Sequence, residues 1–247
     1  MAKKWFTVLE NNPEVMSTLA HRLGLSDELE FYDVYSLDEP ELLAHIPRPA
    51  HAMLVIIPRT PAWDEDRQAE DKAKEDYAGY GEGEPVIWFK QTIGHACGSI
   101  GLLHCAINGP AVNFIEPGST FETIRRDAIP LKMDDRAQML YDSEAFEVAH
   151  KSVANLGDTI PPGIEEGDRL GQHFVAFVKA EDGHLWELEG SRKGPIDRGA
   201  LADDEDVLSS RALDLGLKRV IKLEASAGGH DLRFSAIALA SKSPSLA

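Results

Sequence analysis

The chain has 247 residues, of which 43% are hydrophobic and 27% charged, a balance that is typical of folded proteins and excludes extensive disorder. Its 42 acidic and 25 basic residues give a net charge of −17, which argues against nucleic acid as a partner because phosphate binding needs a basic surface. Two cysteines are too few for a disulfide scaffold, no apolar run reaches the length of a membrane span, and no signal core follows the first lysines. We therefore expect a cytoplasmic protein, with a nuclear location also open, and no membrane partner.

The first third of the chain carries one helix pattern and several short apolar runs. Asn12 as N-cap and Pro13 at the first position predict a helix over 13–25. Apolar runs bounded by turn residues predict strands over 31–35, 52–57 and 85–89. Residues 64–84 hold nine acids and three bases, a net of −6, and are interpreted as a solvated helix with a glycine-rich loop.

Helical patterns dominate the middle of the chain. Ile100, Leu103 and Ile107 recur at helical spacing, which predicts a helix over 97–108. Further helices are expected over 119–127, 133–154 and 202–216. Residues 155–169 are the longest irregular stretch, with four acids and one base, and from pattern alone they fit a lid over a site or a linker between domains equally well.

The last third of the chain predicts a hairpin and a late strand. Residues 173–178 and 185–188 are apolar runs joined across Asp182-Gly183, a dipeptide that favours a tight turn. Residues 232–239 alternate and predict another strand. The serine-rich end, 240–247, is expected to be a flexible tail.

Common metal and nucleotide motifs are absent from the sequence. It has no C-x-x-C, H-E-x-x-H or G-x-x-x-x-G-K-[ST] pattern, and no G-x-S-x-G elbow. We therefore expect no metal and no organic cofactor.

Cys97 is the residue whose position best suits chemistry. It lies where a short loop gives way to the predicted helix, and the positive end of a helix dipole favours a thiolate. The small neighbours Ala96, Gly98 and Ser99 leave room for a carbonyl to approach. A small buried residue at a helix start is the alternative, whereas Cys105 lies among apolar residues and is expected to pack in the core.

A thiolate nucleophile needs a base, and His173 is the best placed of nine histidines. It begins a strongly apolar strand, and the predicted hairpin brings Glu189 close to it, where a carboxylate could fix the tautomer of the ring. Gln91, six residues before Cys97, could donate a hydrogen bond to an oxyanion together with a backbone N–H.

The segment QTIGHACGSIGLLH, residues 91–104, resembles the active-site signature of the ubiquitin C-terminal hydrolases, a family of cysteine deubiquitinating enzymes. HFVAFV at 173–178, followed by GHLWELEG at 183–190, resembles the second signature of that family. Four further segments also resemble family sequence, in the same order along the chain: 9–15, 31–35, 46–49 and 232–239.

This resemblance implies a papain-like cysteine protease fold of the α+β class, a central antiparallel sheet flanked by helices. It implies a single catalytic domain over 1–239, with a crossover loop at about 150–169 that passes over the active site and favours small or unfolded leaving groups. By resemblance Cys97 is the nucleophile, His173 the base and acid, and Gln91 the oxyanion donor. Glu10 and Asp33 match acidic positions that contact the basic C-terminal tail of ubiquitin.

Two positions depart from the family pattern. The family usually has Asp where this chain has Glu189, which is one methylene longer; Asp182 and Asp197 are fallback candidates for the residue that orients His173. Gly94-His95 replaces a more polar pair before the cysteine, and His95 is interpreted as a loop residue.

The resemblance predicts a monomeric hydrolase that acts on the C-terminal glycine of ubiquitin. Two alternatives stay open on sequence alone. One is a hydrolase of a ubiquitin-like modifier, and the other, suggested by Glu189, is a catalytically impaired protein that binds ubiquitin.

Overall fold

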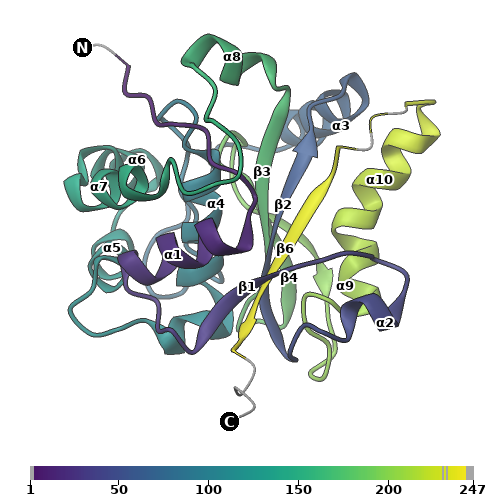
Figure 1. The fold of residues 1–247 in the computed structure, drawn as a ribbon, viewed down its shortest axis with the longest axis horizontal. Helices are drawn as coiled ribbons and strands as arrows, with labels where there is room; N and C mark the ends of the chain where they lie inside the picture. The colour runs from purple at the N-terminus through teal and green to yellow at the C-terminus, as the bar shows by residue number, and fades with distance from the viewer. Residues whose placement is uncertain (1–2, 230, 232, 243–247) are drawn as a thin grey trace.

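The computed structural model describes residues 3–229, 231 and 233–242 and is built around one antiparallel sheet (Figure 1). The strand order in this sheet is β1-β6-β2-β3-β4-β5, and every neighbouring pair is antiparallel. Its strands are β1 (Leu29–Asp33), β2 (Ala50–Pro58), β3 (Gln172–Lys179), β4 (His184–Leu188), β5 (Ile196–Ala200) and β6 (Ser235–Ser241). The expected central antiparallel sheet of an α+β fold is therefore confirmed.

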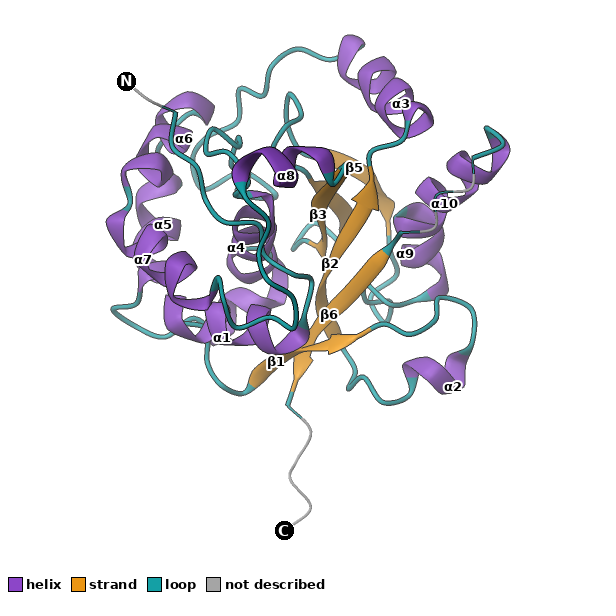
Figure 2. Cartoon of the chain, turned by 45° about the horizontal axis from the view of Figure 1, so that its top comes forward, coloured by secondary structure: helices purple, strands orange, loops and turns teal. Residues whose placement is uncertain are grey.

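Helices cover both faces of the sheet, as Figure 2 shows. On one face lie α1 (Pro13–Leu23), α4 (Cys97–Ile107), a 3-10 turn η1 (Gly109–Phe114), α5 (Thr120–Ala128), α6 (Met133–Asp142) and α7 (Glu144–Val153). On the other lie α2 (Pro40–Leu43), α3 (Pro61–Lys72), α9 (Ser210–Leu215) and α10 (Leu217–Ser226), while α8 (Ile164–Arg169) lies near the end of the sheet where β3 begins.

Two hydrophobic cores explain why the central strands are continuously apolar. Along β3, Phe174 and Ala176 pack into the core under α4, whereas Val175 and Phe177 pack into the core under α9 and α10. Successive side chains of a strand point to opposite faces, so a strand covered on both sides needs apolar residues at every position.

Several predicted helices appear with altered bounds. The first helix is α1, whose N-cap Asn12 accepts hydrogen bonds from the backbone N–H groups of Glu14 and Val15, and it ends at Gly24 in the left-handed conformation. The single helix expected over 133–154 is two helices, α6 and α7, because Ser143 has extended backbone geometry and caps the second.

The helix predicted over 202–216 is wrong for its first half. Residues 202–209 form turns, and only α9 is helical. The carboxylate of Asp206 accepts hydrogen bonds from Arg48 and from the backbone N–H groups of Ala50 and Leu208, which fixes the chain in a turn. β5, α2 and α10 have no counterpart among the predicted elements.

The strand predicted over 85–89 is also wrong. Its backbone is bonded to side chains of the α4 region rather than to a neighbouring strand: Asn108 pairs with both polar groups of Ile87, and the N–H of Phe89 donates to His104. Residues 86–89 are nevertheless buried, as their hydrophobicity indicates.

The predicted boundary of the C-terminal tail and the predicted loop at 150–169 both need correction. β6 continues through Ala240 and Ser241, which pair with Glu30 and Leu29, so a tail cannot begin at 240; residues 243–247 lie outside the described residues. The expected crossover loop begins as the last turn of α7 and ends in α8, which leaves 154–163 as its irregular part. Within the described residues no helix is both long and apolar enough to span a membrane.

Candidate active site

Cys97 is the first residue of α4, as predicted, and lies against β3. Small residues on α4 allow this close approach. A Cβ atom added at Gly101 would lie 2.6 Å from a methyl group of Leu54, and one added at Gly98 would lie 3.3 Å from the ring of Phe174. The sulfur is thus carried on a helix that is fixed tightly to the sheet.

His173 lies near the start of β3 and faces both Cys97 and Glu189. Its Nε2 atom is 2.6 Å from Oε1 of Glu189, whose side chain is fully buried just beyond the end of β4. The predicted hairpin produces this contact, because Ala176 pairs with Leu188 and the strands then run on to His173 and Glu189.

The charges of this group favour a thiolate and an imidazolium. Burial acts to raise the pKa of Cys97, but the hydrogen bond and charge of His173, with the backbone N–H groups of Phe174 and Gly98, hold it below its ordinary value. Burial likewise acts to lower the pKa of His173, yet the charge of Glu189 and the hydrogen bond to Cys97 raise it strongly. A thiolate paired with an imidazolium can attack a carbonyl carbon and then return a proton.

Glu189 is held by more than His173. Its Oε1 atom accepts hydrogen bonds from the backbone N–H and the hydroxyl of Ser191, at 2.7 and 2.6 Å. Its Oε2 atom lies 3.0 Å from Nη1 of Arg67, a residue of α3. Despite burial, these partners hold the pKa of Glu189 far below its usual range, His173 contributing most. The longer side chain therefore reaches His173 with its carboxylate fixed at both oxygens.

Gln91 lies beside the same group and lines a cavity of about 370 Å³ together with Cys97 and His173. Its side-chain amide donates to the carbonyl of Ile93 at 3.1 Å, and its backbone N–H donates to Gly190. These bonds fix the amide next to the cavity, where a substrate oxygen could meet it.

The two fallback carboxylates lie elsewhere. Asp197 is 2.9 Å from Nδ1 of His184, and Asp182 accepts hydrogen bonds from the backbone of His184 and from the indole of Trp186. Glu189 is the acid that contacts His173.

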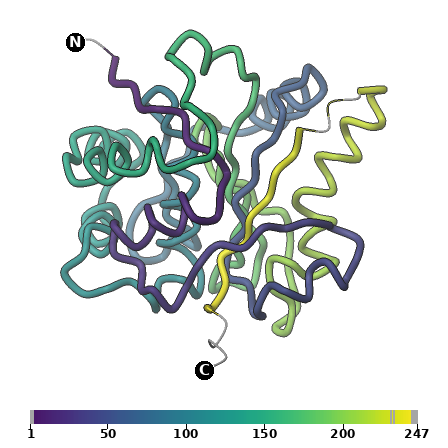
Figure 3. The backbone as a smooth tube through the Cα atoms, viewed as in Figure 1, coloured from purple at the N-terminus to yellow at the C-terminus, as the bar shows by residue number. Residues whose placement is uncertain are grey.

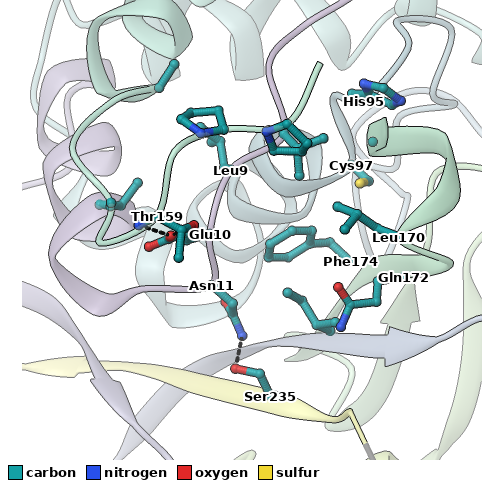
Figure 4. A pocket seen from close by; sticks show the side chains of 18 of the residues that line it. Leu9, Glu10, Asn11, His95, Cys97, Thr159, Leu170, Gln172, Phe174 and Ser235 are labelled. Atoms are coloured by element: carbon teal, nitrogen blue, oxygen red, sulfur yellow. Dashed lines mark hydrogen bonds between the residues drawn. The ribbon is translucent and has the colours of Figure 1, made fainter. Parts of the chain in front are cut away.

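A second and larger cavity, of about 480 Å³, also reaches Cys97 (Figure 4). It is lined by Glu10 and Asn11, by Phe174 of β3, and by residues between 157 and 162. These belong to the crossover segment, which comprises the irregular stretch 154–163 and α8. Figure 3 shows this segment passing alongside the N-terminal stretch of the chain, beside the sheet. The segment thus covers the approach to the sulfur.

Glu10 and Asp33 are not brought together. Glu10 lines the cavity at Cys97, and its carboxylate accepts hydrogen bonds from the backbone of Asp158 and from the backbone and hydroxyl of Thr159. Although burial raises it, the pKa of Glu10 is lowered by these bonds. Asp33 ends β1 and lines a separate hollow with Tyr35 and other residues.

Comparison with known proteins identifies the family to which this chain belongs. Residues 6–222 match the model of the family described as ubiquitin carboxyl-terminal hydrolase, family 1. The horse ubiquitin carboxyl-terminal hydrolase isozyme L1 is 33% identical over 231 residues, which cover 94% of this chain and 96% of that protein. The chain belongs to this family. An Arabidopsis thaliana relative, ubiquitin carboxyl-terminal hydrolase 3, is 36% identical over 81% of each chain.

The fold agrees with that of solved hydrolases. The catalytic domain of UCH37 from Trichinella spiralis, crystallised with ubiquitin vinyl methyl ester, superposes with a TM-score of 0.72 at 22% identity and covers 98% of both chains. The papain-like fold of the ubiquitin carboxyl-terminal hydrolases is therefore confirmed, and the protein is a cysteine-type deubiquitinating enzyme.

The family resemblance did not point to Arg67 or Ser191. Arg67 lies within the acidic segment 64–84, which the sequence suggested was solvated. Several of the acids in this segment instead pair with arginines: Glu70 with Arg192 and Arg198, Asp71 with Arg192, and Asp66 with Arg219. The signal that could have located Arg67 is the amphipathic pattern of α3. Trp63 is the buried residue of this helix, and Arg67 lies one helical turn beyond it, on the same face.

No group of three or more histidine, cysteine, aspartate or glutamate side chains in the described part of the chain is arranged to hold a metal ion.

Proposed function

We propose that this hydrolase cleaves ester, thioester, amide or peptide bonds at the C-terminal glycine of ubiquitin, with Cys97, His173, Glu189 and Gln91 as its catalytic machinery. The observation that carries the proposal is the continuous line of contacts from the Cys97 sulfur through His173 to Glu189. The names of the relatives, each a ubiquitin carboxyl-terminal hydrolase, supply the substrate.

The chemistry proceeds in two halves. The Cys97 thiolate attacks the carbonyl carbon of the terminal glycine, and the negative oxygen that forms is stabilised by the amide of Gln91 and a backbone N–H. His173 donates its proton to the departing amine, alcohol or thiol, which leaves a thioester on Cys97. Water then attacks the thioester, its proton passes to His173, and the thiolate is restored. Glu189 holds the imidazole ring in place and balances its charge throughout.

Ubiquitin enters through its basic C-terminal tail in this proposal. Glu10, at the cavity that reaches Cys97, and Asp33, at the end of β1, are the proposed acidic contacts. Because Glu10 accepts three hydrogen bonds from the crossover segment, the tail must share or replace them.

The protein acts as a monomer in the cytoplasm or nucleus. The crossover segment over the cavity favours small or unfolded leaving groups.

The test is release of a coumarin fluorophore from the C-terminus of ubiquitin. Wild-type protein should release it, Cys97→Ala should not, and wild type should be trapped by ubiquitin carrying a C-terminal electrophile. Equal rates for the two proteins, or no release and no trapping by wild type, would refute the proposal. Selective cleavage of a ubiquitin-like modifier would favour the first alternative.

The second alternative, a ubiquitin-binding protein of low turnover, loses its support at Glu189. The concern was that a glutamate would not fit where the family has aspartate. The 2.6 Å contact with His173 favours a working orienting residue. Tight ubiquitin binding without turnover would reverse this judgement.

A further inference from the structure

His95, two residues before Cys97, is held in an unusual conformation. Its φ of 56° lies in the left-handed region, which is uncommon for residues other than glycine and asparagine. Its ring packs edge-on against Trp5 at 4.8 Å between centroids. The backbone on either side of Trp5 is bonded to Gly94, through the N–H of Phe6 and the carbonyl of Lys4. The side chain of His95 therefore projects in a fixed direction.

That direction leads to the crossover segment. Nε2 of His95 lies 2.9 Å from Oδ1 of Asp168, a residue of α8, and the His95 side chain is only 11% exposed. The neighbouring Gly167 packs directly on the ring, because a Cβ atom there would lie 2.6 Å from Cε1 of His95. α8 thus sits on His95 through one polar contact and one close apolar contact.

This contact stands between the two cavities that reach Cys97. His95, Cys97 and Gly167 line both of them. The larger cavity is lined by Glu10 and residues of the crossover segment, whereas the smaller one is lined by Gln91, His173 and Asp168. Figure 4 shows His95 and Leu170 on either side of the sulfur.

The crossover segment has a second anchor at its other end. There Glu10 accepts the hydrogen bonds of Asp158 and Thr159. Between the anchors Ile160 is 93% exposed, so the middle of the segment packs little against the rest of the molecule. The segment is therefore held at both ends. At the α8 end the carbonyl of Leu170 also accepts a hydrogen bond from Arg233, and the contact at His95 is the one next to the nucleophile.

We propose that His95 and Asp168 form a clasp that keeps the two cavities apart and makes this pair a determinant of the size of the leaving group. The inference rests on the proposed function: the ubiquitin tail occupies the larger cavity and the leaving group departs through the smaller one. With the clasp closed, a leaving group must thread beneath α8. With the clasp open, the two cavities join and a folded leaving group has room.

The experiment compares three single variants with wild type on two substrates. Asp168→Ala removes the acceptor, and His95→Asn shortens the donor while keeping a residue that tolerates the left-handed conformation. Glu165→Ala is the matched control, because it removes an exposed acid from the same helix without touching His95. The substrates are ubiquitin–coumarin and ubiquitin fused at its C-terminus to a folded domain.

Each clasp variant should raise the ratio of kcat/KM for the folded fusion to kcat/KM for ubiquitin–coumarin by roughly two- to fivefold, the size expected for one partly exposed polar contact. Glu165→Ala should leave this ratio at the wild-type value. The double variant His95→Asn/Asp168→Ala should show no further rise, because both changes open one contact. An unchanged ratio in Asp168→Ala, or a fully additive double variant, would overturn the clasp.

Amide hydrogen exchange over residues 164–170 gives a readout that needs no substrate. Asp168→Ala should exchange faster there than wild type and Glu165→Ala. Equal exchange in all three proteins contradicts the clasp even if the enzyme is active. Conversely, faster exchange in an enzyme that fails to cleave ubiquitin–coumarin supports the clasp while refuting the proposed function.

Discussion

Two glutamates of the active-site region, Glu189 and Glu10, show how differently one molecule can hold a carboxylate. Glu189 is fully buried and is held by charged groups, His173 and Arg67, and by Ser191. Glu10 is partly exposed and is held by the backbone and hydroxyl of the crossover segment. Both have lowered pKa values, yet one is fixed by tertiary packing and the other by a segment with little packing of its own.

The difference suits two tasks. A residue that orients a catalytic ring must not move, because a displacement near 1 Å can cost about two orders of magnitude in rate. A residue that receives a substrate tail must give up its resting partners when the substrate arrives. Buried charge pairs are hard to separate, whereas exposed hydrogen bonds exchange readily with a ligand.

The largest effect should come from removing the charge of Glu189. Glu189→Gln leaves His173 without its counter-ion, so the pKa of His173 falls and the thiolate loses its partner. We expect kcat/KM for ubiquitin–coumarin to fall by up to about 10⁴-fold, the loss seen when the third member of a catalytic triad loses its charge. Glu189→Asp is the control, and it should retain much more activity because the charge stays. A larger loss in Glu189→Asp than in Glu189→Gln would show that side-chain length, not charge, is the decisive property.

Arg67 should produce the next largest effect, because it fixes the oxygen of Glu189 that does not face His173. Arg67→Met keeps an aliphatic side chain but removes the guanidinium, which also lies over the ring of Trp63. We expect a loss of about 1–3 kcal/mol in the free energy of unfolding, measured by urea denaturation, and a clear loss of kcat.

The matched control is Arg59→Met. Arg59 precedes α3 and pairs with Asp64 of that helix. Its side chain is 48% exposed, and no ion pair joins it to Glu189. The free energy of unfolding of Arg59→Met should differ from that of wild type by no more than about 0.5 kcal/mol. If the two variants behave alike, Arg67 is an ordinary surface cation and the contrast between the two glutamates weakens.

The pH dependence of activity should reflect the buried groups Cys97 and His173 and not Glu10. The lowered pKa of Cys97 and the raised pKa of His173 predict a thiolate–imidazolium pair over a broad range. Activity should therefore fall on the acid side as the thiolate is protonated, and on the alkaline side as His173 loses its proton. The profile of kcat/KM for ubiquitin–coumarin measures both limbs, and a narrow optimum near the ordinary pKa of histidine would contradict the paired state.

Stability should depend on pH through the same carboxylate. The pKa of Glu189 is lower in the folded protein than in the unfolded chain, so its contribution is present above the unfolded value, about 4.3, and is lost as the pH falls through the folded value. Urea midpoints measured between neutral pH and pH 3 should therefore fall for wild type, and fall less for Glu189→Gln.

The sequence brought Cys97, His173 and Glu189 into one group more readily than it located some of the surrounding elements, for a physical reason. Cys97, His173 and Glu189 lie on a helix start and a hairpin, which are local structures with strong signals. Arg67 reaches Glu189 from 122 residues away along the chain, and no local pattern encodes that distance. The strand predicted over 85–89 was wrong for a related reason. Hydrophobicity indicates burial, but it does not reveal that the side chains of Asn108 and His104 supply the hydrogen bonds of this backbone.

The smallest effect is expected at Glu10. Glu10→Gln keeps an acceptor oxygen for the crossover segment but removes the charge proposed to attract the ubiquitin tail. Because the site is partly exposed, we expect KM to rise about two- to fivefold with kcat little changed, and the rise should shrink as salt is added because salt screens exposed charges. Glu14→Gln on α1 is the control, since Glu14 lines neither of the cavities at Cys97. A loss of kcat as large as that of Glu189→Gln would mean that Glu10 also positions the nucleophile, and the two sides of the site would then be one rigid unit.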